Sequence, residues 1–298
     1  YEAVWKQIAE RFAKYDEHLI FESMNEEFDG TYDGDPNKEY YANLNQYNQI
    51  FVDTVRGTGE KNTHRWLLVP GWNTNIEYTI GDYGFEMPTD EKCSAGESRM
   101  MVSVHYYDPW DYCGIEDLKT ILWGEYGDNL IEVNGFPKMN KAKWGDESYL
   151  DDLFSRMQEK FVKNDIPVII GEYGCIDKSS AYADFAGQIQ GNRAYWDGYV
   201  AGKAASMGMI PVYWDNGFNG VYGFGLFDRN TYEQTQPEII STILKAVKNK
   251  DPKAGLDTVV ENKAEKTDEA HAYIGIQTEV YTFRNTCSDA KYGKDTDY

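Results

Sequence analysis

The stretch Pro-Val-Ile-Ile-Gly-Glu-Tyr-Gly at residues 167–174 decides the fold, because an unbroken apolar run leads directly to a carboxylate. Residues 18–26, His-Leu-Ile-Phe-Glu-Ser-Met-Asn-Glu, follow the same plan. Three more apolar runs, at residues 65–70, 100–107 and 210–216, also lead to polar or aromatic residues. Strands that are apolar throughout are typical of a parallel sheet covered by helices. These five runs therefore predict five parallel strands.

Helices are predicted between the strands, because apolar residues recur there at the spacing of one helix face. The predicted helices cover residues 3–14, 35–56, 147–164, 190–207 and 236–248. Alternating strands and helices predict right-handed βα units, and polar residues at successive strand ends are typical of a barrel mouth. The glycine-rich turn of a doubly wound nucleotide-binding fold does not occur in the sequence. We therefore predict an α/β fold, a partial TIM-type (β/α) barrel with five recognisable βα units.

The charge balance limits the class of partner. The 298 residues include 29 Lys and Arg against 50 Asp and Glu, a formal net charge of −21. Nucleic acids and anionic membrane surfaces are disfavoured, because both require clustered positive charge. No segment approaches the roughly 18 consecutive apolar residues of a transmembrane helix. An uncharged partner, such as a sugar polymer, is compatible with this surface.

The cysteines and histidines give no metal signature. The cysteines are widely spaced, without a Cys-x-x-Cys pair, which argues against structural zinc. We considered one disulfide, Cys93–Cys113, against four free thiols, and the free thiols are the simpler interpretation. The histidines are dispersed along the chain. We therefore predict no metal site and no cofactor.

Two carboxylates mark the predicted barrel mouth. Glu26 and Glu172 stand at the ends of the first and fourth predicted strands. Such a pair suits glycoside hydrolysis, in which one protonates the leaving oxygen and the other attacks the anomeric carbon or activates water. Asn25 directly precedes Glu26 and is placed to hydrogen-bond a sugar 2-hydroxyl. Glu26 and Glu172 are therefore catalytic candidates, and Asn25 is a substrate-binding candidate.

Further candidates lie at the other strand ends. His105 and Tyr107 are two residues apart on one strand, so their side chains point the same way, and Tyr107 can hold a carboxylate in its ionised form. Three tryptophans, Trp72, Trp110 and Trp214, offer faces on which sugar rings can stack. Any one of these residues alone is more often a core or surface residue. The ordered set on five strand ends nevertheless favours a functional site.

These motifs resemble those of glycoside hydrolase family 5, the cellulase family. Residues 19–26 are similar to its Asn-Glu motif, and His105-Tyr106-Tyr107 is similar to its His-x-Tyr motif. Residues 170–174 are similar to its nucleophile motif, and Tyr213-Trp214-Asp215 to its final-strand tryptophan. The resemblance extends from residue 1 to about 250. A Val-Pro-Gly-x-Asn segment at residues 69–73 resembles the bacterial endoglucanases and xyloglucanases in particular.

The resemblance implies a retaining hydrolase of β-1,4-glucan of the cellulose or carboxymethylcellulose type. Glu26 would be the acid/base and Glu172 the nucleophile, while Trp214 would form the floor under the reacting sugar. His105 and Tyr107 would position the carboxylates. Xyloglucan, mixed-linkage glucan, mannan and xylan remain open as substrates, as does exo action. A secreted microbial enzyme is implied, with no signal peptide in this chain, and the other hypothesis is a non-catalytic carbohydrate-binding remnant.

The sequence departs from the family pattern in two ways. Glu27 follows the Asn-Glu pair where the family usually has proline. The resemblance also begins at the family's fourth strand, so the five units correspond to strands 4–8. Five strands cannot close a barrel of that size, so we expect homo-oligomer formation through the open edges, or coverage by the tail. The expected organisation is a partial barrel over 1–250, a linker over 251–270, and a strand-forming tail or truncated accessory module over 271–298.

Overall fold

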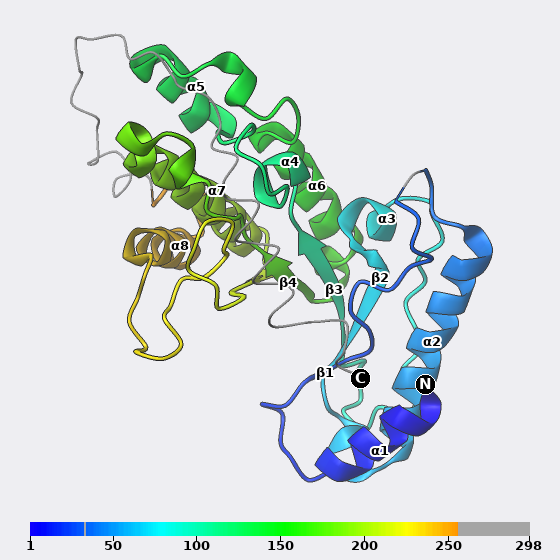
Figure 1. Ribbon diagram of the computed structural model, residues 1–298. Helices are drawn as coiled ribbons and strands as arrows, with labels where there is room; N and C mark the ends of the chain where they lie inside the picture. The colour runs from blue at the N-terminus through cyan, green and yellow to red at the C-terminus, as the bar shows by residue number, and fades with distance from the viewer. Residues whose placement is uncertain (33, 256–298) are drawn as a thin grey trace, which may run out of the picture.

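A single parallel sheet forms the centre of the computed structural model, which describes residues 1–32 and 34–255 (Figure 1). Its five strands pair in chain order, and every neighbouring pair is parallel. The strands are β1 (Phe21–Glu22), β2 (Leu67–Asn75), β3 (Met100–Tyr106), β4 (Val168–Tyr173) and β5 (Ile210–Tyr213). This order confirms the predicted partial (β/α) barrel.

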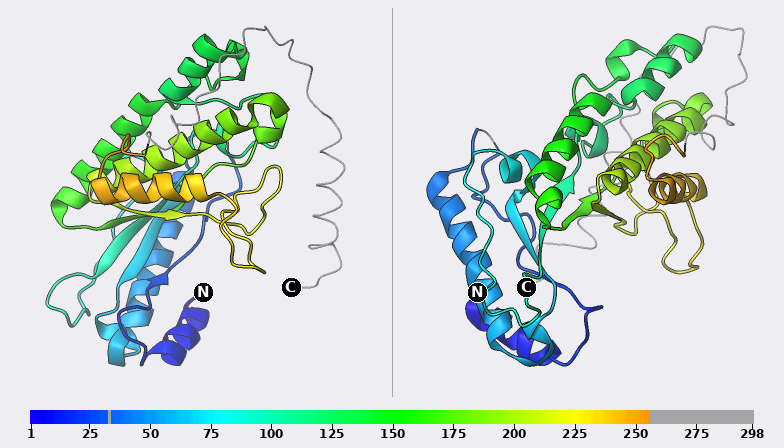
Figure 2. Two further views of the ribbon diagram at one scale, coloured as in Figure 1. Left: turned by 90° about the vertical axis from the view of Figure 1, so that its left-hand side faces the viewer. Right: turned by 180° about the vertical axis from the view of Figure 1, so that it is seen from behind.

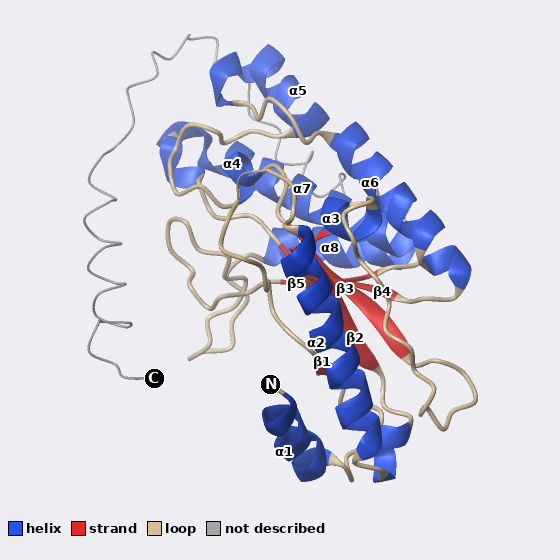
Figure 3. Ribbon diagram, turned by 90° about the vertical axis from the view of Figure 1, so that its right-hand side faces the viewer, coloured by secondary structure: helices blue, strands red, loops and turns tan. Residues whose placement is uncertain are grey.

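Helices connect the strands and cover one side of the sheet. They are α1 (Glu2–Phe12), α2 (Lys38–Gly57), α3 (Ile76–Ile80), α4 (Trp110–Cys113), α5 (Gly124–Asn134), α6 (Glu147–Lys160), α7 (Ala186–Ser206) and α8 (Pro237–Asn249). The view from behind in Figure 2 shows α2 and α6 along that side, and Figure 3 shows α2 lying along the strands. Among the described residues, no helix is long and apolar enough to span a membrane.

The main core lies between the sheet and helices α6 and α7. Tyr106 at the end of β3 stacks on Trp196 of α7, with ring centroids 5.8 Å apart and planes at 13°. Phe154 of α6 meets the same tyrosine edge to face at 5.3 Å. All three side chains are buried, as is Leu150 one helical turn before Phe154. The core therefore anchors β3, whose last residues lead into the candidate site.

The first part of the fold depends on a buried arginine. Arg65 precedes β2 and donates hydrogen bonds to the carbonyl oxygens of Phe12 (3.1 Å), Tyr15 (2.6 Å), Asp16 (2.8 Å) and Leu19 (2.5 Å). The guanidinium thus satisfies the carbonyls of the segment that joins α1 to β1. Because a buried charge is stable only when it is hydrogen-bonded, this network holds β1 against β2.

The structure corrects two local expectations. Only Phe21–Glu22 of the predicted strand at 18–26 pairs as a strand. The chain turns away after Ser23, whose hydroxyl donates to Asn48 Oδ1 at 2.6 Å. Helix α2 begins at Lys38 rather than at 35, because the Asn37 side chain accepts the N–H groups of the first turn.

The cysteines in the described residues are free thiols. Cys93, Cys113 and Cys175 form no disulfide, so the Cys93–Cys113 pairing is wrong. Cys113 is fully buried in the main core, where a thiol behaves as a small apolar side chain. Cys287, most of the expected linker and the expected tail over 271–298 lie outside the described residues.

Leu150 of α6 is fully buried against the sheet, and its packing should stabilise the fold. Leu150→Ala should lower the free energy of unfolding by about 2–5 kcal/mol, because truncation leaves a cavity under β3. Leu244→Ala on α8 is the matched control; this leucine is exposed, so its truncation should change stability by about 0.5 kcal/mol or less. Urea unfolding followed by circular dichroism measures both. Equal losses of unfolding free energy in the two variants would contradict the burial of Leu150 between α6 and the sheet.

Candidate active site

The pairing of the strands brings the candidate residues to one edge of the sheet. In the β3–β4 register His105 pairs with Glu172, and in the β2–β3 register it pairs with Asn75. Glu26 follows β1 by four residues and reaches the same edge. Because all five strands are parallel, their carboxyl ends meet there. Residues far apart in the sequence thus become neighbours.

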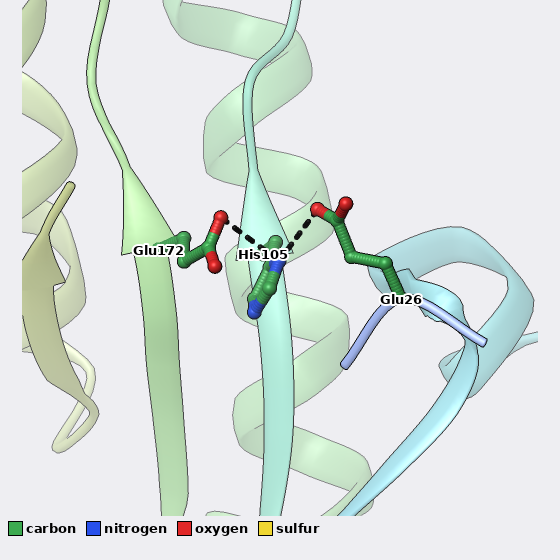
Figure 4. Close-up of side chains that lie close together, drawn as sticks. All are labelled: Glu26, His105 and Glu172. Carbon is green, nitrogen blue, oxygen red and sulfur yellow. Dashed lines mark hydrogen bonds and ion pairs between the residues drawn. The ribbon is translucent and has the colours of Figure 1, made fainter. Parts of the chain in front are cut away.

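A single imidazole lies between the two carboxylates (Figure 4). Nδ1 of His105 is 2.8 Å from Glu26 Oε1 and 3.4 Å from Glu172 Oε2. The Tyr107 hydroxyl donates a hydrogen bond of 2.8 Å to the same Glu172 oxygen. Four of the sequence-predicted residues therefore form one hydrogen-bonded group.

A small residue on β4 makes room for the imidazole. A Cβ atom on Gly171 would lie 3.5 Å from His105 Nε2 and 3.3 Å from Ser103 Oγ. Below the imidazole, the buried Ser103 hydroxyl donates to Glu22 Oε1 at 2.5 Å. A larger side chain at 171 would crowd both β3 groups, so the Gly-Glu pair in the β4 sequence has a packing reason.

The two carboxylates occupy different environments. The Glu26 side chain is 43% exposed, whereas that of Glu172 is 15% exposed. Burial raises the pKa of Glu172 above its usual value, and the nearby carboxylates Glu26 and Glu22 raise it further. His105 and the Tyr107 hydrogen bond oppose this rise. Burial and the Glu172 charge raise the pKa of Tyr107 far above its usual value, so its hydroxyl stays protonated and donates.

A pocket of about 610 Å³ opens beside Glu26. Its walls include Asn73 and Asn75 from the end of β2, and Asp108 and Trp110 from the segment after β3. Asp108 and both asparagines were not predicted from the sequence as site residues. Their position in the sequence could have indicated them as site residues, since each lies at or just beyond the end of a strand.

The three tryptophan candidates have different surroundings. Trp110 is 52% exposed and meets Tyr107 edge to face at 6.1 Å. Trp214 is 42% exposed, and its backbone N–H donates to the Tyr173 carbonyl at 2.9 Å, which places it beside Glu172. Trp72 is 3% exposed and packs against Tyr41 of α2. The expectation that Trp72 stacks on a sugar is corrected, because its ring is part of the core.

The loop that carries Glu26 has an unusual backbone. Glu26 has a φ of +50°, and Asn73 and Thr74 have φ values of +50° and +48°, a region that residues other than glycine rarely adopt. The Asn73 N–H donates to the Glu27 carbonyl at 3.0 Å, which ties the loop to β2. Asn25 is exposed in the same loop. Such conformations concentrate at functional sites.

The same group offers ligand atoms for a cation. One atom each from Glu26, His105 and Glu172 lies within 4.8 Å of the others. These atoms are already engaged with one another, since His105 Nδ1 contacts both carboxylates. A cation would have to displace these contacts. The arrangement as it stands suits proton transfer and nucleophilic attack by carboxylates.

Comparison with known proteins confirms the resemblance. The chain matches the family described as Cellulase (glycosyl hydrolase family 5) over residues 1–220. It is 49% identical over 251 residues to Endoglucanase A of Paenibacillus barcinonensis, which covers 83% of this chain and 60% of that protein.

Solved structures agree in fold. A family 5 xyloglucanase from Paenibacillus pabuli, in complex with ligand, gives a TM-score of 0.76 at 49% identity, over 83% of this chain and 66% of that one. A Bacteroides ovatus GH5 xyloglucanase, in complex with a XXXG heptasaccharide, gives a TM-score of 0.71 at 32% identity. That match covers 83% of this chain and 50% of the xyloglucanase chain. The chain thus spans about half to two thirds of the relatives it matches. It belongs to glycosyl hydrolase family 5, the cellulase family.

Proposed function

We propose that the protein is a retaining glycoside hydrolase that cleaves β-1,4-glucan by double displacement. The observation that carries the proposal is the contact of one His105 nitrogen with both carboxylates, which brings an oxygen of Glu26 and one of Glu172 within 4.8 Å. Retaining enzymes hold their carboxyl groups about 5–5.5 Å apart, whereas inverting enzymes leave about 6.5–9.5 Å for a water molecule. The short separation favours retention.

The environments of the two carboxylates support separate roles. Glu172 attacks the anomeric carbon and forms a glycosyl ester, while Glu26 gives its proton to the leaving oxygen. Glu26 then takes a proton from the water that hydrolyses the ester. The Tyr107 hydrogen bond favours the ionised form of Glu172, which the attack requires, and the more exposed Glu26 can exchange its proton with incoming water.

The substrate proposal is a neutral β-glucan. The net charge of −21 disfavours polyanions, and the relatives are named as an endoglucanase and as xyloglucanases. Trp110 and Trp214 are both exposed, which suits stacking on sugar rings of a bound glucan chain. Asn25 is proposed to bind the 2-hydroxyl and Trp214 to underlie the reacting sugar. Polysaccharides are degraded outside the cell, so we propose an extracellular enzyme.

Exchange of each carboxylate tests the assigned roles. Glu172→Gln should lower kcat on carboxymethylcellulose and xyloglucan by at least about 1000-fold, because the nucleophile is lost. Glu26→Gln should also be inactive on polysaccharide. It should still release a burst of dinitrophenolate from a dinitrophenyl cellobioside, whose leaving group needs no proton, before the slow hydrolysis of the glycosyl ester limits turnover. Glu132→Gln, on the exposed face of α5, is the control. Glucan binding by wild type without turnover would support the carbohydrate-binding remnant instead.

The pH profile tests the role of Tyr107. Its hydrogen bond lowers the pKa of Glu172, so Tyr107→Phe should raise that pKa. Because Glu172 must be ionised to attack, the acid limb of kcat/KM should move to higher pH. Tyr232→Phe, at an exposed position, should leave the limb in place. An acid limb that stays fixed in Tyr107→Phe would contradict this hydrogen bond as a determinant of the Glu172 pKa.

We also propose that copies of this chain associate through the open edges of the sheet. Ile210 and Val212 of β5 are exposed, and β5 pairs only with β4 among the described strands. Exposed apolar edge strands invite pairing with another chain. The partners of the protein are then β-glucan and a second copy.

Light scattering tests the association. The 298-residue chain should give a mass above that of one copy, and Val212→Lys should lower it because a charge opposes edge pairing. Val133→Lys on the exposed side of α5 is the matched control and should leave the mass unchanged. A clean monomer across the concentration range would contradict the proposal.

A further inference from the structure

A third carboxylate, that of Glu22 on β1, points to the face of the sheet opposite the helices. Phe21, the residue before it, packs with Leu67 and Val69 in a core cluster that also includes residues of α1 and α2. Because successive side chains of a strand point to opposite faces, Glu22 points away from that core. Its side chain is partly buried, and no described lysine, arginine or histidine forms an ion pair with it. The assigned catalytic steps do not use this carboxylate.

Three side chains along β3 and just beyond its end each contact a carboxylate. The fully buried Ser103 hydroxyl donates to Glu22 Oε1 at 2.5 Å. Two residues further along the chain, His105 Nδ1 contacts both catalytic carboxylates. Two residues further again, the Tyr107 hydroxyl donates to the proposed nucleophile. Residues two apart on a strand share a face, so Glu22 lies at the level below the catalytic pair.

The hydrogen bond from Ser103 to Glu22 crosses one strand. β2 lies between β1 and β3 in the sheet, and alternate strands contribute the side chains of one layer inside a β/α barrel. Gly171 on β4 faces this layer and the next one, because a Cβ atom there would lie 3.3 Å from Ser103 Oγ and 3.5 Å from His105 Nε2. The layer that holds Glu22 is therefore adjacent to the layer that holds the imidazole.

The charge of Glu22 acts on the proposed nucleophile. Burial is the largest cause that raises the pKa of Glu172, and the charges of Glu26 and Glu22 add to the rise. His105 and the hydrogen bond from Tyr107 oppose it. These four titratable groups face Glu172 from β1, from the loop after β1, and from β3 and its end. Since a like charge nearby disfavours the ionised form, removal of the Glu22 charge should lower the pKa of Glu172.

We propose that Glu22 is a positioning residue of the reaction, which holds Ser103 below His105 and places a negative charge beneath the catalytic pair. The inference rests on the proposed function and deepens it. Positive charge develops on the sugar in the oxocarbenium-like transition state of glycoside hydrolysis, and a preorganised charge of opposite sign stabilises it. Because the bound sugar is neutral before it reacts, Glu22 should contribute to kcat rather than to KM.

Glu22→Gln separates the charge from the hydrogen bond, because the amide oxygen can still accept the Ser103 hydroxyl. On a cello-oligosaccharide it should lower kcat about tenfold and change KM less than about twofold. Without the Glu22 charge, Glu172 ionises more readily, so the acid limb of kcat/KM should move about half a pH unit lower. Ser103→Ala removes the hydrogen bond and keeps the charge, so its acid limb should stay in place.

The pKa of Glu172 can also be measured without turnover, by NMR titration of the glutamate carboxyl groups with the Glu172 signal assigned by its loss in Glu172→Gln. Glu22→Gln should lower this pKa by about half a unit. Glu17→Gln, at an exposed position before β1, is the matched control and should change neither kcat nor this pKa.

A lower kcat in Glu22→Gln with an unmoved acid limb and an unchanged Glu172 pKa would assign Glu22 a purely structural role and overturn the inference. An unchanged kcat in that variant would overturn it as well. Wild type that cleaves no glucan would instead overturn the proposed function and the catalytic part of the inference, while the NMR titration would still decide whether the Glu22 charge acts on Glu172.

Discussion

One imidazole nitrogen between two carboxylates is the constraint on which the site depends. A ring nitrogen carries at most one hydrogen atom, so Nδ1 of His105 can donate to only one carboxylate at a time. The distances of 2.8 Å to Glu26 and 3.4 Å to Glu172 show which one it favours. Glu172 receives its own donor from Tyr107 at 2.8 Å. Each carboxylate thus has its own hydrogen-bond partner. His105 lies on β3 and Tyr107 directly follows that strand, which packs in the largest core cluster.

The irregular backbone of the protein gathers at the same edge. The register shifts in the sheet fall between Pro70 and Asn75, between Val104 and His105, and between Ile170 and Tyr173, always toward the carboxyl ends of the strands. Glu26, Asn73 and Thr74 adopt left-handed conformations nearby. Bulges and strained residues re-aim side chains. The regularly paired part of the sheet packs against the core, and the irregular carboxyl edge orients the side chains of the site.

The sequence pattern predicted the parts of this arrangement that depend on local periodicity. Apolar runs located the strands, and the two-residue spacing of His105 and Tyr107 predicted that both side chains point the same way where β3 ends. The burial of Trp72 was not predictable in this way, because it depends on how a bulged β2 packs against Tyr41 of α2. Asp108 was missed for a similar reason. Its placement depends on hydrogen bonds from Tyr149 and Trp196, which approach it from α6 and α7.

The two sides of the carboxylate pair differ in how far the described residues enclose them. On the Glu26 side, β2, β3 and the start of α4 enclose a pocket with an aromatic wall. On the Glu172 side, Trp214 stands next to β5, whose Ile210 and Val212 are exposed. The Glu26 side is therefore lined by side chains already in place. Within the described residues the β5 edge pairs with β4 alone and exposes apolar side chains, so it forms no comparable wall.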